Sequence, residues 1–177
     1  MGVVLCGGKS VRMGADKGLM MQDDKPWSVV VAEKFTALNV PFVVSINSEQ
    51  LLTYQNYFEI NTLKIDNQTI PGPLRGLLTT HQQYPEKNLL VLACDMVDMK
   101  QQTVQLLINN YIKIPDFDYY AYHNGSFWEP FCGIYTANGL SNLNTDSNYS
   151  MQHLLASGHT QKNKILNVES FNNYNTM

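Results

Sequence analysis

Residues 3–17 read VVLCGGKSVRMGADK, and the interpretation of the whole chain starts from this stretch. A short apolar run ends in paired glycines, and three cations and one acid follow within nine residues. This order predicts a buried strand leading into a loop with bare backbone and positive side chains. Glycines let backbone N–H groups approach a ligand closely, and successive N–H groups form an anion-binding concavity. The stretch therefore predicts a phosphate-binding loop.

The cations of this loop suit phosphate in two ways. Arg12 offers a planar fork for phosphate oxygens, while Lys9 and Lys17 offer compact point charges. The chain carries a formal net charge of −3, so the positive loop runs against its background. The alternative is a solvated surface loop with ordinary lysines. The spacing of Arg12, Gly14 and Lys17 favours phosphate binding over that alternative.

Both common nucleotide-binding motifs fail on spacing. A P-loop needs a glycine five positions before its Gly-Lys-Ser, and Val3 occupies that position. The dinucleotide fingerprint needs Gly-x-Gly-x-x-Gly, which no register of the glycines at 7, 8 and 14 supplies. The loop therefore belongs to neither class.

Composition sets the broad class of protein. A chain of 177 residues, 44% of them hydrophobic, is expected to form a single domain over residues 1–177 with a sizeable core. The three cysteines are far apart and show no Cys-x-x-Cys spacing, so we expect reduced thiols and a cytoplasmic location. We see no signal peptide and no membrane-spanning run. A pI near 5.7 without basic clusters argues against nucleic acid as the main partner.

Apolar runs and helical periodicity alternate along the chain. Strands are expected at residues 2–6, 42–46, 63–65, 89–94, 118–122, 131–135 and 164–168. Helices are expected at residues 26–38, 49–58, from the 71–73 turn to about 84, and at 100–112, 137–143 and 149–157. This alternation predicts an α/β fold: a three-layer, Rossmann-like arrangement of a mostly parallel sheet with helices on both faces.

Four candidate site residues directly follow predicted strands: Gly7, Asn47, Asp66 and Asp95. Ligands of open α/β sheets bind beyond the carboxyl ends of the strands. We therefore expect these four residues to lie on one edge of the sheet. A carboxylate there, near a phosphate loop, can hold Mg²⁺ together with substrate phosphates, which makes Asp95 the candidate metal ligand. The alternative is that Asp95 caps the next helix, although Asp98 is better placed for a cap.

The signature Leu-x-Gly-Gly-x-Ser-x-Arg-Met-Gly-x-Asp-Lys, which starts at Leu5, resembles the opening of a family of nucleotidyltransferases, especially the molybdenum cofactor guanylyltransferases. Cys6 stands where alanine is usual. Leu-Ala-Cys-Asp, ending at Asp95, resembles the family's second signature, whose aspartate binds magnesium. The segment GPLRG at residues 72–76 resembles the family's Gly-Pro-Leu-x-Gly, which lines the base pocket. The resemblance implies the nucleotide-diphospho-sugar transferase-like fold.

The resemblance also assigns site residues. It implies nucleotide binding by eight residues, including the backbone of the loop: Leu5, Cys6, Gly7, Gly8, Lys17, Asn47, Asp66 and Asp95. It implies that Arg12, Lys17 and Asp95 carry the transfer and that Asp95 binds Mg²⁺. From the residues alone, an asparagine after a strand, such as Asn47, is most often a turn residue, and the alternative for Asp66 is a solvated loop acid.

The end of the chain resembles the family's Phe-x-Asn-x-Asn-Thr segment, which lies on the pterin side of the site. The resemblance implies acceptor binding by Asn173 and Asn175, and these amides favour guanylyl over cytidylyl transfer. Bare sequence would assign the same Asn-rich tail to disorder. His123, Gly125 and Pro130 fall in a segment resembling the acceptor-side loop.

The implied reaction is attack by the terminal phosphate of molybdopterin on the α-phosphorus of GTP, with pyrophosphate leaving. A phosphate monoester is largely ionised near pH 7, so no strong general base is required. The resemblance makes GTP and molybdopterin the substrates, and molybdoenzymes or their chaperones plausible partners. The alternatives are a related enzyme that uses CTP or another phosphate acceptor, and a non-catalytic nucleotide-binding partner protein.

Overall fold

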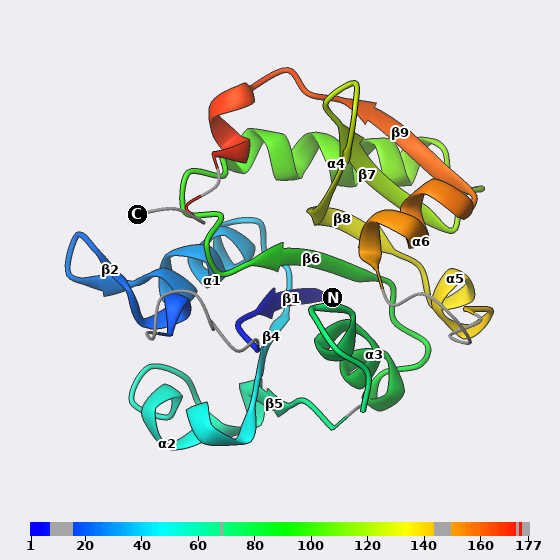
Figure 1. Ribbon diagram of the computed structural model, residues 1–177. Helices are drawn as coiled ribbons and strands as arrows, with labels where there is room; N and C mark the ends of the chain where they lie inside the picture. The colour runs from blue at the N-terminus through cyan, green and yellow to red at the C-terminus, as the bar shows by residue number, and fades with distance from the viewer. Residues whose placement is uncertain (8–15, 68, 144–149, 173, 175–177) are drawn as a thin grey trace.

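The computed structural model describes residues 1–7, 16–67, 69–143, 150–172 and 174 (Figure 1). Within these residues, seven strands form one main sheet. Their order is β5 (Leu63–Ile65), β4 (Phe42–Ile46), β1 (Gly2–Leu5), β6 (Leu89–Ala93), β8 (Trp128–Tyr135), β7 (Tyr119–His123) and β9 (Thr160–Lys164). All neighbouring strands pair in parallel except β8, which runs antiparallel to both β6 and β7. The prediction of a mostly parallel sheet is confirmed.

Helices cover both faces of this sheet. They are α1 (Trp27–Ala37), α2 (Leu51–Tyr54), α3 (Leu74–Gln83), α4 (Gln101–Lys113), α5 (Ala137–Ser141) and α6 (Met151–Ser157), with 3₁₀ turns η1 (Lys17–Leu19), η2 (Ser48–Gln50), η3 (Ile60–Thr62) and η4 (Val168–Phe171). One core cluster joins one face to α1, α2 and α4. A second cluster joins the other face to α3, α5 and α6. The expected three-layer architecture is therefore present.

The central strands read as continuous apolar runs because both faces of the sheet are covered. Side chains alternate between the faces: Val4 and Cys6 enter one core cluster, and Val3 and Leu5 enter the other. All five residues of β6 are buried for the same reason. Burial of this kind stabilises by roughly 25 cal/mol per Å² of apolar surface removed from water.

The last strand is not where the sequence pattern placed it. We expected a strand at 164–168, but β9 covers Thr160–Lys164 and pairs in parallel with β7 at the edge of the sheet. Its residues are polar, and Asn163 alone among the five is buried. Edge strands carry such polar and charged side chains, so the hydrophobic pattern missed it. Leu166, part of the run that suggested a strand, is 75% exposed.

The sequence also missed a hairpin in front of α1. Strands β2 (Met21–Gln22) and β3 (Lys25–Pro26) pair antiparallel around Asp23 and Asp24, which both have positive φ. A two-residue turn of this kind usually contains Asn-Gly or Asp-Gly, so the Asp-Asp pair gave no signal. The helix expected at 49–58 is shorter than predicted: α2 covers only Leu51–Tyr54, and Leu52 within it is 79% exposed.

The chain order places a crevice at the carboxyl ends of β1 and β6. The connection after β1 leads to β4 on one side, whereas the connection after β6 leads to the β7–β8 half on the other. Neighbouring strands whose outgoing connections diverge form a topological switch point, where ligands bind in open α/β sheets. Because β1, β4, β5 and β6 are parallel, their carboxyl ends share one edge of the sheet, as expected. No helix among the described residues is long and apolar enough to cross a membrane.

Candidate functional site

A lysine and an aspartate meet at the switch point. Lys17 begins η1 after the loop that follows β1, and Asp95 comes shortly after β6. Lys17 Nζ lies 3.2 Å from Asp95 Oδ2, and the two side chains are 18% and 20% exposed. A cation and a carboxylate that are 78 positions apart in sequence are thereby brought together, partly shielded from water. Of the other loop residues, Gly8, Lys9 and Arg12 lie outside the described part of the chain.

Asp95 does not cap the helix that follows it. The N-cap position of α4 is Lys100, whose side chain makes no capping bond. Asp98, the expected alternative cap, instead accepts hydrogen bonds from Asn172 Nδ2 at 2.9 Å and Tyr174 Oη at 2.6 Å. The two bonds lower the pKa of Asp98 and attach the C-terminal segment beside the switch point. Asn173 and Asn175, the predicted acceptor ligands, lie outside the described residues.

Asp66 is held against the first glycine of the loop. Ser45 Oγ donates a hydrogen bond to Asp66 Oδ1 at 2.6 Å. A Cβ atom on Gly7 would collide with Asp66 Oδ2, and one on Gly76 would collide with Ser45 Oγ. Burial raises the pKa of Asp66, and the Ser45 hydrogen bond and the Arg75 charge oppose that rise. Sequence reasoning missed Ser45 because its role depends on a strand-to-strand contact.

Asn47 both caps a turn and lines a cavity. Its Oδ1 accepts from the backbone N–H groups of Glu49 and Gln50, at 2.9 and 3.1 Å. Because the oxygen is committed to the cap, the Nδ2 group is the part of the amide that can donate to a ligand. Asn47, Gly7, Asp66 and the turn after it line one cavity of about 570 Å³. A donor and an acceptor are therefore presented to the same space.

A second cavity, of about 710 Å³, lies where β7 and β9 end and β8 begins, on the same edge of the sheet. His123, Gly125, Lys162 and Lys164 are among its lining residues. Desolvation and the Lys162 charge lower the pKa of His123. His123 and Gly125, which resemblance placed on the acceptor side, thus border a cavity beside the nucleotide edge, whereas Pro130 is not among the lining residues.

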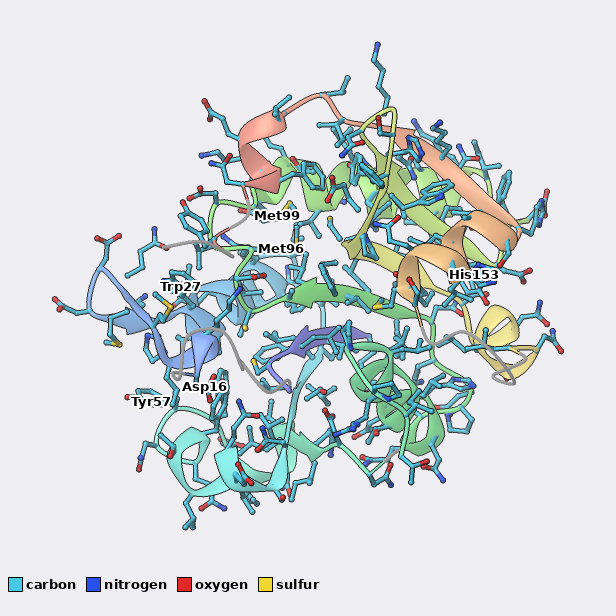
Figure 2. All side chains as sticks on the ribbon, viewed as in Figure 1. Asp16, Trp27, Tyr57, Met96, Met99 and His153 are labelled. Carbon is cyan, nitrogen blue, oxygen red and sulfur yellow. The ribbon has the colours of Figure 1, made fainter. Side chains whose placement is uncertain are left out.

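The described residues contain neither a disulfide bond nor a cluster of metal ligands. No group of three or more His, Cys, Asp or Glu side chains there could hold a metal ion by itself. All three cysteines are described, and all are free and buried, in agreement with the expected reduced thiols. Figure 2 shows Asp16 on the same side of the molecule as Met96 and Met99, which follow β6, whereas His153 of α6 lies on the opposite side.

Open α/β sheets bind their ligands at such a switch point, and the nucleotide-binding α/β proteins are one class built in this way. More narrowly, the chain belongs to the family described as the MobA-like NTP transferase domain, which matches residues 2–162. The protein is thus a nucleotidyltransferase by family.

The chain is also similar to proteins whose names place them in molybdenum cofactor biosynthesis. The chain is 28% identical over 175 residues to a probable molybdenum cofactor guanylyltransferase of Flavobacterium johnsoniae, covering 97% of this chain and 86% of that protein. It is 31% identical over 136 residues to a molybdenum cofactor biosynthesis bifunctional protein of Synechocystis, of which it spans only 38%.

The fold also matches a solved structure. Molybdopterin-guanine dinucleotide biosynthesis protein A from Archaeoglobus fulgidus aligns with a TM-score of 0.78 and 21% identity. The alignment covers 99% of this chain and 93% of that one. The likeness shows that the two chains share a fold from end to end.

Proposed function

We propose that the protein transfers GMP from GTP to the terminal phosphate of molybdopterin, giving the guanine dinucleotide form and pyrophosphate. The observation that carries the proposal is the pair formed by Lys17 and Asp95 at the switch point. The names of the relatives supply the substrates. Nucleotidyl transfer requires charge neutralisation and alignment more than covalent chemistry, and a cation beside a carboxylate provides both.

Asp95 fits Mg²⁺ as a metal bound jointly with substrate. Mg²⁺ keeps several waters and binds through one or two carboxylates plus phosphate oxygens, so a single partly exposed aspartate is a suitable protein ligand. Bound there, the ion would neutralise triphosphate charge and hold the phosphates in line. Lys17 would bind oxygens of the α-phosphoryl group and of the departing pyrophosphate. Arg12 and Lys9 are proposed to assist, and the backbone at residues 5–8 to hold the nucleotide.

The cavity beside the switch point suits guanine. Guanine presents an acceptor, O6, next to N–H donors at N1 and N2. Asp66 can accept from those donors when it is ionised, and the free Nδ2 group of Asn47 can donate to an acceptor. Cytosine offers one amino group and two acceptors, which leaves less for a carboxylate to bind. The two side chains therefore support GTP over CTP.

The acceptor would bind on the other half of the same edge. Asn173 and Asn175 remain proposed acceptor ligands, because Asn172 and Tyr174 fix neighbouring positions to Asp98. A phosphate monoester already carries most of its negative charge at pH 7, so the attacking oxygen needs orientation and not a strong base. Location in the cytoplasm and delivery of product to molybdoenzymes or their chaperones complete the proposal.

Pyrophosphate release measured with each of the four ribonucleoside triphosphates, Mg²⁺ and molybdopterin tests this function. We expect release with GTP and acceptor together, and little with ATP, CTP or UTP. Preference for CTP would replace the guanylyl assignment with the cytidylyl one. Tight GTP binding without release would favour a nucleotide-binding partner protein.

Ser45→Ala should make GTP binding more sensitive to acid. Removing the hydrogen bond to an ionised carboxylate raises the pKa of Asp66 further, and a hydrogen bond to a charged group is worth about 1.5–3 kcal/mol. A higher pKa means that Asp66 becomes protonated, and stops accepting from guanine, at a higher pH. We expect GTP affinity to fall about tenfold more than in wild type between about pH 8 and about pH 5.

Ser28→Ala is the matched control for this prediction. Ser28 is fully buried in α1, and its hydroxyl has no partner among the described residues, so the change removes the same atom without touching Asp66. The measurement is the dissociation constant of GTP across this pH range for wild type, Ser45→Ala and Ser28→Ala. Parallel pH profiles for wild type and Ser45→Ala would show that this hydroxyl does not tune the nucleotide site.

A further inference from the structure

One buried amide connects three parts of the nucleotide site. Gln50, the last residue of η2, donates from Nε2 to Asp16 Oδ2 at 2.6 Å and to the Cys6 carbonyl at 3.2 Å. Its Oε1 accepts from the Asn47 backbone N–H at 2.8 Å. The side chain therefore joins the end of β1, the turn beside the base cavity and the residue directly before Lys17.

The Asp16 carboxylate is fixed at its other oxygen as well. Asp16 Oδ1 accepts from Gly18 N at 2.9 Å and from Tyr54 Oη at 3.0 Å. Burial raises the pKa of Tyr54, which keeps its hydroxyl a donor. A Cβ atom on Gly18 would collide with Tyr54 Oη, so glycine is required for this close approach. Figure 2 shows Asp16 in the region between the turns around α2 and the residues that follow β6.

Capping explains only part of this arrangement. Gln50 completes a capping box with Asn47, and the box uses Oε1 together with the Asn47 side chain. The two donors of Nε2 reach out of the turn, to β1 and to the segment that begins η1. A residue that served only the cap would have no need of them.

We propose that Gln50 is a positioning residue that fixes the backbone at Asp16 and so holds Lys17 at the phosphates while Asn47 is held at the base. The inference rests on the proposed transfer and assigns it a residue that acts through its neighbours. Lys17 is covalently next to the carboxylate that Gln50 holds, so a displaced Asp16 moves the Lys17 ammonium. Misplacement of a group in the reacting constellation by about 1 Å can cost about a hundredfold in rate.

Gln50→Glu is the sharpest single change because the new carboxylate keeps the acceptor for the Asn47 N–H and the shape of the side chain. It loses both donors and faces the Asp16 carboxylate at hydrogen-bond distance. At neutral pH the two like charges repel. We expect kcat for pyrophosphate release to fall about tenfold or more, with a smaller change in KM for GTP, and part of the loss to be recovered as the pH is lowered and the pair shares a proton.

The swap Gln50→Glu with Asp16→Asn distinguishes positioning from a general structural role. The exchange restores one donor facing one acceptor, while the amide oxygen at position 16 can still accept from Gly18 N and Tyr54 Oη. Asp16→Asn alone sets two amide donors against each other and should also lower kcat. The swap does not restore the donor to the Cys6 carbonyl, so the double variant is expected to remain slower than wild type but to be at least about tenfold faster than the product of its two single losses, a coupling that only interacting side chains give.

Gln55→Glu is the control: it adds the same charge at an exposed position just after α2 and should leave kcat unchanged. A double variant as slow as the product of its single losses, or wild-type kcat in Gln50→Glu, would overturn the inference. Failure of the proposed function has a different signature, because wild-type protein would then release no pyrophosphate from GTP. In that case GTP affinity takes the place of kcat, and the positioning role stands only if each single variant weakens GTP binding and the swap reverses that weakening.

Discussion

Asp95→Ala is expected to lower Mg²⁺-dependent guanylyl transfer by about a thousandfold while the protein remains folded. A metal that neutralises phosphoryl charge is worth several kcal/mol in the transition state, and about 4 kcal/mol corresponds to a factor of about 10³. Asp95 would be the protein's ligand to that metal, at the edge where β6 ends. The side chain is on the surface of the crevice and not in the core, so its removal should cost little stability.

Steady-state pyrophosphate release as a function of Mg²⁺ concentration measures this effect. Asp95→Asn keeps the size of the side chain and should be nearly as impaired, since the charge is what binds the metal. Asp116→Ala, an exposed aspartate in the loop before β7 at the amino end of the sheet, should retain full activity. Near-normal turnover in Asp95→Ala would remove Asp95 from the metal role.

Lys17→Ala should reduce kcat by about a hundredfold, as expected for loss of one preorganised donor to developing charge. Lys17 Nζ lies 3.2 Å from Asp95 Oδ2, so the ammonium is next to the carboxylate that we propose as the metal ligand. Because the contact strengthens as pyrophosphate departs, kcat should fall more than GTP affinity. Lys17→Arg keeps the charge but changes its shape, and should retain part of the activity.

Single-turnover and steady-state kinetics together separate these effects. Lys87→Ala, an exposed lysine just before β6 at the opposite end of that strand, is the matched control and should behave as wild type. Thermal unfolding of each variant shows whether the fold is retained. Unaltered kinetics in Lys17→Ala would show that this lysine is an ordinary solvated side chain.

Much of the fold was predictable because buried parallel strands carry an unbroken apolar signal. β4 and β5 have the predicted bounds, and β6 ends one residue earlier than expected. The position of the edge strand β9 was predicted wrongly because its residues are polar, and polar residues give no hydrophobic pattern. The hairpin at Asp23 and Asp24 was missed because its turn lacks the glycine of the usual Asn-Gly and Asp-Gly turns and its strands are only two residues long.

The residues of the candidate site also fall into two groups: those that local sequence could identify and those that it could not. Asn47, Asp66 and Asp95 could be placed on one edge because each directly follows a strand, a local property of the sequence. Ser45 and Gln50 could not be assigned, since their importance depends on contacts across 21 and 34 positions of the chain. The Asn-x-x-Gln spacing at 47–50 was a readable capping signal, but it gives no hint of the two bonds made by Nε2.

The C-terminal segment shows how a correct kind of interaction can be assigned to the wrong partner. Asp98 was expected to bind backbone N–H groups at the start of α4, and it does accept hydrogen bonds, but from Asn172 and Tyr174. An Asn-rich tail that composition assigns to disorder is therefore attached to the molecule at these positions. The preference of aspartate for cap positions correctly indicated that Asp98 accepts hydrogen bonds. Which residues donate those bonds depends on the tertiary fold.

Position-labelled GTP tests the central claim most directly. Protein, Mg²⁺ and molybdopterin are incubated with GTP labelled at either the α- or the γ-phosphate, and the products are separated. Attack on the α-phosphorus places the α-label in the molybdopterin product and the γ-label in pyrophosphate. Recovery of the γ-label as inorganic phosphate or on the acceptor, with no α-label transferred, would contradict nucleotidyl transfer at the crevice of Lys17 and Asp95.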